Sequence, residues 1–195
     1  GQSLRQVEAM HEVLRLKEVK VFDVASSHSE ELARTVEQRY GTSAKAVSSA
    51  EEAVRDSDVV VTVTPSSTPV VQDSWVGAGT HISAIGADAP GKEELDPALL
   101  KHAKVVVDDW EQASHSGEIN VPVQNGSLTR AAIHADIGEV VAGLKPGRTS
   151  DDEITVFDST GLAIQDVITA WQAYRVACEK GLGAEIDPLY LSGTA

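Results

Sequence analysis

Short apolar runs alternate with helical patterns along this chain, and this alternation constrains its fold more than any other feature. Residues 58–63 form a run that is almost entirely β-branched, as expected of a strand buried on both faces of a sheet. Apolar residues recurring at spacings of three and four predict a helix over residues 2–16. Repetition of strand, helix and strand implies parallel βαβ units. The predicted fold class is therefore α/β, a doubly wound parallel sheet of the Rossmann-like kind.

The rest of the chain follows the same alternation. Further strands are predicted over residues 19–24, 45–47, 81–86, 105–108 and 154–157, and helices over 29–40, 49–56, 97–101, 112–117, 130–142 and 161–180. Ser29 is a candidate cap for its helix, and Gly41 a candidate terminator. Residues 181–195 are punctuated by Gly and Pro, and we expect a loose tail there that carries the apolar residues Ile186, Leu189, Tyr190 and Leu191.

The first residues of the sequence already have a helical pattern, with no strand before them. A doubly wound nucleotide fold normally begins with a strand and a glycine-rich turn. We therefore expect the first strand and its glycine turn upstream of Gly1, so that the sheet described by this sequence lacks them. Asp23 ends the next predicted strand about twenty residues on, where a ribose-binding acid is expected. An Asp at a strand end is equally common as a turn or cap residue.

Composition narrows the possible partners. Thirty acidic residues face sixteen basic ones, for a formal net charge of −14. Nucleic acid and anionic membranes are therefore poor partners, because both require clustered Lys and Arg. The acidic balance indicates a self-repelling surface or adaptation to high salt. No apolar run is long enough to cross a bilayer, and the single cysteine, Cys178, excludes an internal disulfide, which together favour a soluble cytosolic protein.

Two other kinds of site are disfavoured by the residues present. Residues 86–92 match G-x-x-x-x-G-K, but Glu93 stands where a phosphate-binding loop has Ser or Thr, Asp88 would repel phosphate, and Pro90 lacks a backbone N–H. The histidines have no ligand partners at metal-binding spacing, so no metal site is predicted. Cys178 lies on an apolar helix face and is predicted to be part of the core, and packing is also expected for Trp171 and Tyr174.

Three segments carry a resemblance to a known family. Residues 62–65 read Thr-Val-Thr-Pro, residues 79–92 read Gly-Thr-His-Ile-Ser-Ala-Ile-Gly-Ala-Asp-Ala-Pro-Gly-Lys, and residues 152–166 read Asp-Glu-Ile-Thr-Val-Phe-Asp-Ser-Thr-Gly-Leu-Ala-Ile-Gln-Asp. Together with Glu-Leu-Asp-Pro at 94–97 and the run at 105–109, their order and spacing resemble the ornithine cyclodeaminase/mu-crystallin family over nearly the whole chain.

The resemblance implies a set of site residues. Asp88 corresponds to the family's catalytic acid, which acts on the substrate amine. Gln2 corresponds to the glutamine of the family's dinucleotide turn. Asp23 would bind the ribose hydroxyls of NAD and disfavour the extra phosphate of NADP by repulsion. The other implied cofactor-binding residues are Thr64, Pro65, Ser83, Ser159 and Thr160, although the last two are equally suited to capping a helix.

The resemblance also implies a function for the whole protein. Residues 1–160 would be the NAD(P)-binding domain, and residues 161–195 a helix and tail that pack on a substrate and dimerisation domain outside this sequence. The implied enzyme is a homodimer acting on a small amino or imino acid, with ornithine cyclodeaminase as the leading hypothesis. Alanine dehydrogenase and ketimine reductase are alternatives within the family, and a non-catalytic binder of a nucleotide or small ligand is an alternative of another class. This sequence alone is expected to be inactive.

Overall fold

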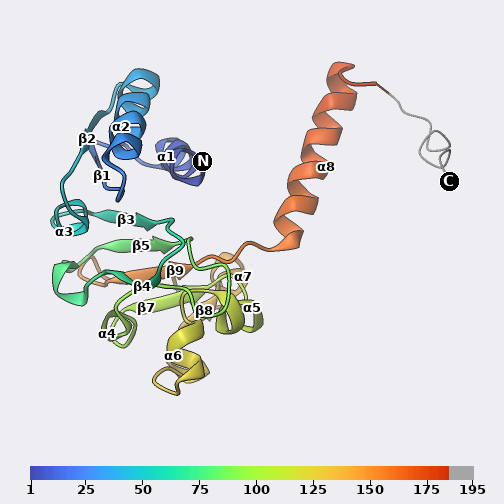
Figure 1. Ribbon diagram of the computed structural model, residues 1–195. Helices are drawn as coiled ribbons and strands as arrows, with labels where there is room; N and C mark the ends of the chain where they lie inside the picture. Colours follow the sequence, from blue (N-terminus) through green and yellow to red (C-terminus); the bar gives the residue numbers. More distant parts are fainter. Residues whose placement is uncertain (185–195) are drawn as a thin grey trace, which may run out of the picture. The chain divides into compact units, whose positions relative to one another are not determined.

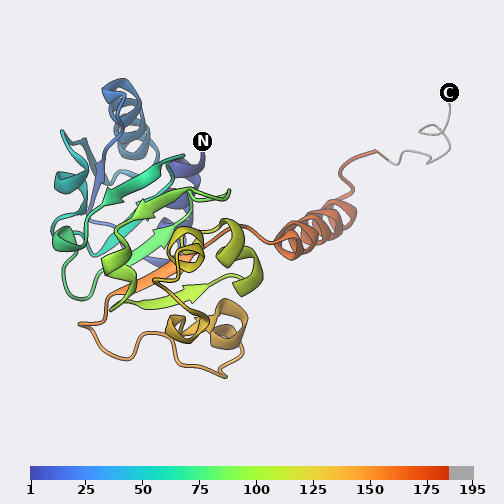
Figure 2. The same ribbon diagram turned by 60° about the horizontal axis from the view of Figure 1, so that its bottom comes forward.

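A five-stranded parallel sheet organises most of the chain. The computed structural model describes residues 1–184, which fall into two units that meet between Thr160 and Gly161. In the first unit the strand order is β3-β5-β9-β7-β8, and every pair is parallel (Figures 1 and 2). The strands are β3 (Val59–Thr62), β5 (His81–Ala84), β9 (Thr155–Asp158), β7 (Lys104–Val107) and β8 (Ala135–Asp136).

Burial alternates along these strands. In β3, Val60 and Thr62 are buried, whereas Val59 and Val61 are half-buried, so only one face of the predicted run is fully covered. The main core contains fully buried side chains from strands and helices, among them Ile82, Leu95, Leu99, Val105, Ile119 and Val156. Each such side chain stabilises the fold by roughly 1.5–3 kcal/mol relative to exposure, which makes this cluster the main source of stability.

A second, smaller core lies under two further strands. β1 (Glu18–Val21) and β2 (Ser43–Ala46) pair in parallel, and α2 (Ser26–Tyr40) connects them. Their buried residues pack with Leu4 and Val7 of α1 (Gln2–Val13). Gly41 ends α2 in the left-handed conformation, with φ of +65°, as predicted. The start of α2 was predicted wrongly: the helix begins three residues before Ser29, whose hydroxyl donates to the Ser26 carbonyl instead of capping the helix.

Two strands and a helix escaped prediction because their residues are polar or contain proline. β4 (Ser67–Val71) and β6 (Glu93–Leu95) form a separate parallel pair, and α6 (Asn120–Gln124) includes Pro122. Acidic residues and proline are depleted in strands, so neither β4 nor β6 has a strand-like sequence. The remaining short helices are α3 (Ala50–Val54), α4 (Pro97–Leu100), α5 (Trp110–Ser116) and the 3-10 turn η1 (Asp73–Trp75).

The continuous helix predicted over residues 130–142 is wrong. The segment contains the 3-10 turn η2 (Arg130–Ala132), then β8, then α7 (Ile137–Val141). The Glu139 carboxylate accepts the N–H of Asp136 at 3.0 Å, which starts a new helix at this point. β8 pairs with β7, so tertiary pairing overrides the helical pattern.

The second unit contains α8 (Ala163–Lys180). Its apolar side chains are spaced three or four apart and are more than half exposed: Ile164, Val167, Ile168, Trp171 and Tyr174. Cys178 is also exposed, so the prediction that it belongs to the core is wrong, and Trp171 and Tyr174 stack on each other with ring centroids 5.8 Å apart. The predicted loose tail with Ile186, Leu189, Tyr190 and Leu191 lies outside the described residues. Within residues 1–184, no helix is both long and apolar enough to cross a membrane.

Candidate functional site

The carboxyl ends of parallel strands meet at one edge of the main sheet, which we call the carboxyl edge. Three of its strands lead directly into predicted site residues: β3 into Thr64 and Pro65, β5 into Asp88, and β9 into Ser159 and Thr160. Open parallel sheets bind ligands at this edge, because the connecting loops leave a crevice there. The fold therefore brings five of the eight predicted residues to one edge.

The loops after β3 and β5 are held against each other by one buried carboxyl group. The side chain of Glu94, on β6, is fully buried. Its Oε1 accepts the N–H of Thr64 at 2.6 Å, and its Oε2 accepts the N–H of Gly86 at 2.9 Å. The loops approach so closely that a Cβ on Gly86 would lie 2.3 Å from the Thr64 carbonyl oxygen. Only glycine fits at this position without moving the backbone.

A second buried carboxyl group anchors the first. Glu118 is fully buried, and its Oε1 accepts the N–H groups of Glu94 at 2.9 Å and Leu95 at 2.6 Å. Burial raises the pKa of Glu118 well above its ordinary value, although these backbone hydrogen bonds oppose the shift. The strand that carries Glu94 is thus held in place by a second buried acid, Glu118.

Asp158, the last residue of β9, completes the series of buried acids. Its Oδ2 accepts the N–H of Ile119 at 3.1 Å, while Oδ1 has no hydrogen-bond partner among residues 1–184. A Cβ on Gly117 would lie 2.7 Å from both of its carboxyl oxygens. Burial raises the pKa of Asp158 to about 7, and repulsion from Asp108 adds to the shift. This carboxyl group therefore changes its charge near neutral pH.

Thr160 is fixed by the neighbouring strand. Asp108, immediately after β7, accepts the N–H of Thr160 at 2.6 Å and its hydroxyl at 2.9 Å. The predicted helix-capping role is not seen for Thr160 or Ser159, because α8 begins at Ala163 and its N-cap is Leu162. The Ser159 N–H donates to the Ala84 carbonyl, which continues the ladder between β5 and β9.

Asp88 extends from the carboxyl edge toward solvent. Its side chain is 64% exposed and forms an ion pair with Lys92. The hydrogen bond from Lys92 lowers the pKa of Asp88, so the carboxylate is ionised at neutral pH. An ionised carboxylate here can stabilise a positive charge on a ligand or accept its proton, and the ion pair with Lys92 favours the first role because it makes the carboxylate a weaker base.

Three predicted residues lie elsewhere. Ser83 is in the body of β5, and its hydroxyl contacts Nε2 of His81 at 3.3 Å. Asp23 follows β1 in the separate two-stranded sheet, where its Oδ1 accepts the N–H of Ala25 at 2.8 Å in a turn. Gln2 is the exposed first residue of α1. Asp23 thus has the turn role that was the alternative to ribose binding, and its side chain remains 41% exposed.

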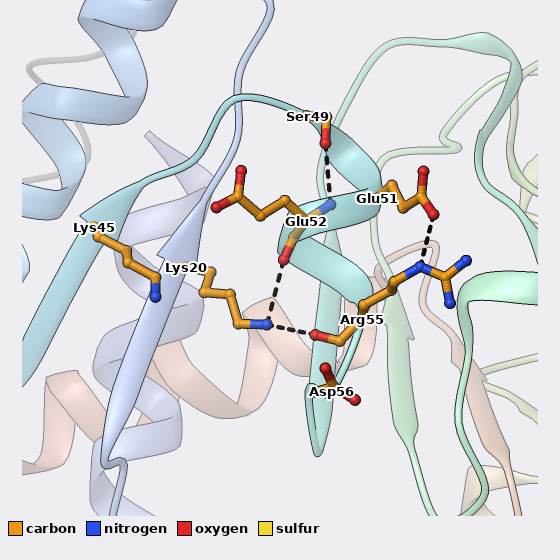
Figure 3. Close-up of a pocket in the computed structure, with 7 residues that line it drawn as sticks. All are labelled: Lys20, Lys45, Ser49, Glu51, Glu52, Arg55 and Asp56. Atoms are coloured by element: carbon orange, nitrogen blue, oxygen red, sulfur yellow. Dashed lines mark hydrogen bonds and ion pairs between the residues drawn. The ribbon is translucent and has the colours of Figure 1, made fainter.

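A surface hollow of about 390 Å³ beside α3 is lined mostly by charged groups, several of which bind one another or the backbone (Figure 3). Lys20 donates to the carbonyls of Glu52 and Arg55, and Arg55 donates to Glu51 at 2.6 Å. A second hollow, of about 440 Å³, lies beside His11, whose ring stacks on Tyr40. Neither hollow includes a residue of the carboxyl edge, and we assign no function to either.

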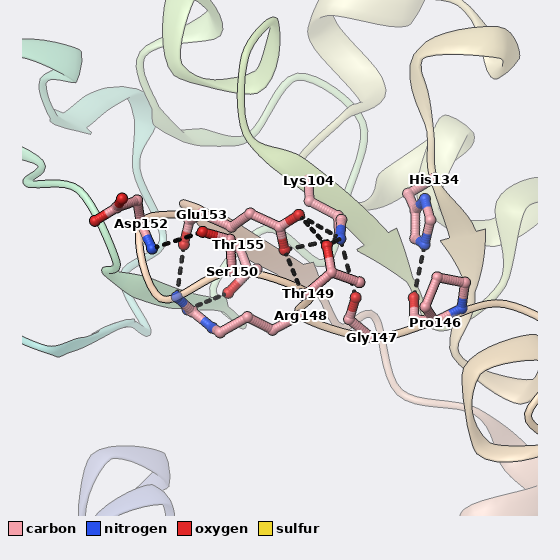
Figure 4. A network of polar contacts seen from close by, with 10 residues as sticks. All are labelled: Lys104, His134, Pro146, Gly147, Arg148, Thr149, Ser150, Asp152, Glu153 and Thr155. Atoms are coloured by element: carbon pink, nitrogen blue, oxygen red, sulfur yellow. Dashed lines mark hydrogen bonds and ion pairs between the residues drawn. The ribbon is translucent and has the colours of Figure 1, made fainter.

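The opposite edge of the sheet, where the strands begin, is fastened by cations (Figure 4). Lys104, the first residue of β7, donates to both carboxyl oxygens of Glu153, at 2.7 and 2.8 Å. Arg148 donates to the carbonyls of Gly79 and Glu153 and to the hydroxyl of Thr155. The hydrogen bond from Lys104 contributes most to lowering the pKa of Glu153 to about 2. We call this the amino edge.

The carboxyl edge also contains residues that sequence analysis did not single out, namely Glu94, Glu118, Asp108 and Asp158. Glu94, Asp108 and Asp158 lie inside the segments that carry the family resemblance, so their presence was visible but their partners were not. Within the described part of the chain, no group of three or more His, Cys, Asp or Glu residues could hold a metal ion.

This parallel sheet, with its polar loops gathered at the carboxyl ends of the strands, defines a Rossmann-like doubly wound α/β protein, and likeness to solved structures confirms the predicted fold class. The model of the ornithine cyclodeaminase/mu-crystallin family matches residues 1–181. The chain belongs to this family, as its motifs predicted.

Known relatives place the chain more closely. It is 55% identical over 185 residues to an alanine dehydrogenase of Archaeoglobus fulgidus, an alignment that covers 95% of this chain and 56% of that protein. An archaeal alanine dehydrogenase dimer with bound NAD superposes with a TM-score of 0.92 at 53% identity, over 96% of this chain and 57% of that one. The Delta(1)-pyrroline-2-carboxylate reductase of Thermococcus litoralis, in complex with NADH and L-proline, superposes with a TM-score of 0.91 at 36% identity, over 95% and 58%. The chain therefore spans a little more than half the length of these relatives.

Proposed function

We propose that the protein carrying this sequence is an NAD-dependent oxidoreductase that interconverts a small amino acid and the corresponding imino acid. The observation that carries the proposal is the 55% identity to an alanine dehydrogenase over 95% of the chain. The family hypothesis had favoured ornithine cyclodeaminase. The relatives named above are a dehydrogenase and an imino-acid reductase, so the proposal moves to the alternative that the sequence analysis left open.

Groups at the carboxyl edge, together with Asp23 after β1, fit a nicotinamide dinucleotide by their chemistry. Asp23 offers a partly exposed carboxylate, which accepts hydrogen bonds from a ribose diol and repels an added phosphate. The backbone of Thr64 and Pro65 and the segment of Ser159 and Thr160 would line the cofactor at the ends of β3 and β9. Gln2, at the start of α1, and Ser83 are the other proposed contacts. When bound, NAD supplies the hydride acceptor for oxidation of the amino acid.

Asp88 is the proposed catalytic acid–base group. Oxidation at the carbon that bears the amine requires a neutral amine, so a proton must leave the ammonium form of the substrate. The Asp88 carboxylate, kept ionised by Lys92, accepts that proton and passes it to solvent, so that it is anionic again when loss of the hydride leaves a positive charge on the imine. In the reductive direction the same carboxyl group returns the proton to the amine.

The role of Asp88 is tested by Asp88→Asn in the complete protein. Loss of the proton acceptor is expected to lower kcat by roughly 100-fold or more while NADH still binds. Glu51→Gln is the matched control, since Glu51 also forms an i,i+4 ion pair, with Arg55, but lies far from the carboxyl edge. Equal losses of turnover in the two variants would contradict the assignment.

The preference for NAD over NADP is tested at Asp23. Asp23→Ser removes the repelling charge, and we expect the ratio of NADP to NAD affinity, measured by calorimetry, to rise by about tenfold or more. His28 is 3.6 Å from the Asp23 carboxylate, so both cofactors are titrated at the same pH. A wild-type protein that already prefers NADP would contradict the role of Asp23.

The products separate the competing activities. A dehydrogenase or imine reductase changes the amount of NADH as it works, whereas a cyclodeaminase releases ammonia with no net change in NADH. A protein that binds NADH but turns over neither pyruvate with ammonium, nor a cyclic imino acid, nor ornithine would be the non-catalytic binder.

The second unit has its own proposed role. The exposed apolar face of α8 is proposed to pack on the substrate-binding and dimerisation part that the resemblance places outside residues 1–195, in a homodimer. Trp171→Glu is then expected to shift sedimentation of the complete protein from dimer toward monomer. An unchanged dimer with full activity would exclude α8 from that packing.

A further inference from the structure

The loops after β3 and β5 leave the sheet at the same point, and two of their amides need an acceptor there. The last ladder hydrogen bond between these loops runs from the Ile85 N–H to the Thr62 carbonyl. Beyond it, the N–H groups of Thr64 and Gly86 both donate to the single carboxyl group of Glu94. A buried N–H without an acceptor is costly, so this carboxyl group satisfies both loops at once.

Glu94 is itself held firmly. β6 pairs with β4 at Glu93 and Leu95. The backbone N–H groups of Glu94 and Leu95 donate to the Glu118 carboxyl group, and the N–H of Glu93 donates to the Ser66 carbonyl. The side chain is fully buried, so it cannot exchange its partners for water. Its position therefore constrains the positions of the two loops.

The proposed functional groups stand on these two loops. Thr64 and Pro65 follow β3, and Asp88 comes two residues after Gly86. We infer that Glu94 is a positioning residue: by clasping the amides of Thr64 and Gly86, it fixes the distance between the proposed cofactor-contacting loop and the catalytic carboxylate. This inference rests on the proposed function and adds to it a residue that contacts neither substrate nor cofactor.

Reaction rates are sensitive to such a distance. A displacement of about 1 Å in the alignment of reacting groups can cost on the order of 100-fold in rate. The clasp joins residues 30 and 8 positions away from Glu94, so no local turn can replace it. Its removal should therefore reduce turnover even in protein that remains folded.

The principal test is Glu94→Gln in the complete protein. The amide side chain has the same shape but only one acceptor oxygen, so its NH₂ group faces one of the two backbone N–H groups. Glu94→Asp keeps the carboxyl group but is too short to reach both loops. We expect both variants to lower kcat roughly 10- to 100-fold in protein that is still folded, with a melting temperature lowered by several degrees because a buried N–H loses its acceptor. If the carboxyl group alone mattered, Glu94→Asp would retain the wild-type kcat.

Glu93→Gln is the matched control. Glu93 is the neighbouring carboxyl group, 7% exposed, and its Oε1 has no hydrogen-bond partner in the described part of the chain. Among the described residues, no hydrogen bond joins the Glu93 side chain to either loop, so kcat should be unchanged. An equal loss of kcat at both positions would overturn the inference, because it would reflect general disturbance of β6.

Hydrogen–deuterium exchange separates failure of the clasp from failure of the proposed function. Peptides covering residues 62–66 and 84–88 should exchange about tenfold faster in Glu94→Gln and at the wild-type rate in Glu93→Gln. Unchanged exchange in Glu94→Gln would overturn the clasp. If Glu94→Gln exchanges faster but the wild-type protein turns over no amino or imino acid, the role of Glu94 in holding the loops is supported and only the proposed function is overturned.

Discussion

The two edges of the main sheet are held together in opposite ways. At the carboxyl edge, Glu94, Glu118 and Asp158 are fully buried and accept backbone N–H groups. At the amino edge, Lys104 and Glu153 are partly exposed and neutralise each other, while Arg148 donates to backbone carbonyls (Figure 4). Among the described residues, the same sheet thus ends in buried acids without a basic partner on one side and in paired charges on the other.

This difference separates the requirements of function from those of stability. A partly exposed ion pair costs little to form and its partners remain solvated, so the charged groups at the amino edge serve to hold the strands and loops together. A buried carboxyl group costs much more to ionise, and its pKa moves accordingly, as Glu118 and Asp158 illustrate. Such groups cluster where an enzyme must hold loops in fixed positions around a ligand. We infer that the carboxyl edge carries the activity and the amino edge maintains the fold.

The largest expected effect comes from adding one methyl group to each edge. In Gly86→Ala the new Cβ would lie 2.3 Å from the backbone oxygen of Thr64, so the loops after β3 and β5 must separate. In Gly79→Ala it would lie 2.5 Å from the Asp151 carbonyl oxygen, at a residue with φ of +83°. Each should lower the free energy of unfolding by more than about 3 kcal/mol, measured with urea. Only Gly86→Ala should also abolish NADH binding.

Gly138→Ala serves as the control for both, because no atom lies within 4 Å of its added Cβ and the residue is in α7. Its stability should equal or slightly exceed that of the wild type. If Gly79→Ala, once refolded, lost NADH binding as completely as Gly86→Ala, the separation between the two edges would fail.

The next effect is a difference in pH dependence. The folded-state pKa of Asp158 is raised to about 7, so the folded protein binds this proton more tightly than the unfolded chain, and stability should rise as pH falls from about 7 toward 3.8. The pKa of Glu153 is lowered to about 2, so its contribution is present above pH 4.5 and lost as pH falls toward 2. Asp158→Asn should remove the first change, worth a few kcal/mol at most. Glu153→Gln should remove the second.

These pH profiles are measured by urea unfolding at a series of pH values. The two variants serve as controls for each other, since each should alter only its own interval. A wild-type stability that is flat between pH 4 and 7 and insensitive to Asp158→Asn would contradict the raised pKa and the account of the carboxyl edge built on it.

The smallest effect is expected from breaking the fastening at the amino edge. Lys104→Met removes the ion-pair partner of Glu153, but Thr149 still donates to that carboxylate and its side chain is 25% exposed, so water can solvate it. The melting temperature should therefore fall by only a few degrees, and less in high salt, with NADH affinity unchanged. Lys101→Met, at an exposed lysine after α4, is the control and should have no effect. Weaker NADH binding in Lys104→Met would show that the amino edge also contributes to the site.

The parts of the fold that could be predicted are those with a local signal. The β-branched runs at 59–62 and 104–107 form strands because their side chains suit a pleated, buried surface. β6 could not be predicted, because Glu93 and Glu94 are buried only through partners distant in sequence. The helix predicted over 130–142 failed for the same reason, since pairing with β7 redirects residues 135 and 136 into a strand.

The candidate site divides in the same manner. Motifs placed Asp88, Thr64, Pro65, Ser159 and Thr160, and the topology brings them to one edge. The acids that support them were not predicted, because a Glu or Asp is ordinarily a solvated or capping residue. Only the tertiary structure brings Glu94 to Thr64, and Asp158 to the N–H of Ile119, 39 residues away. The exposure of Cys178 was likewise missed, since an apolar helix face in sequence does not reveal what covers it.

The most direct test of the central claim is hydrogen–deuterium exchange of the complete protein with and without NADH. Our account predicts slower exchange in the presence of NADH for residues 62–66, 84–92 and 158–161 at the carboxyl edge, and unchanged exchange for residues 102–105 and 147–155 at the amino edge. Protection confined to the amino edge, or no protection anywhere in residues 1–184, would contradict the assignment of the carboxyl edge as the functional site.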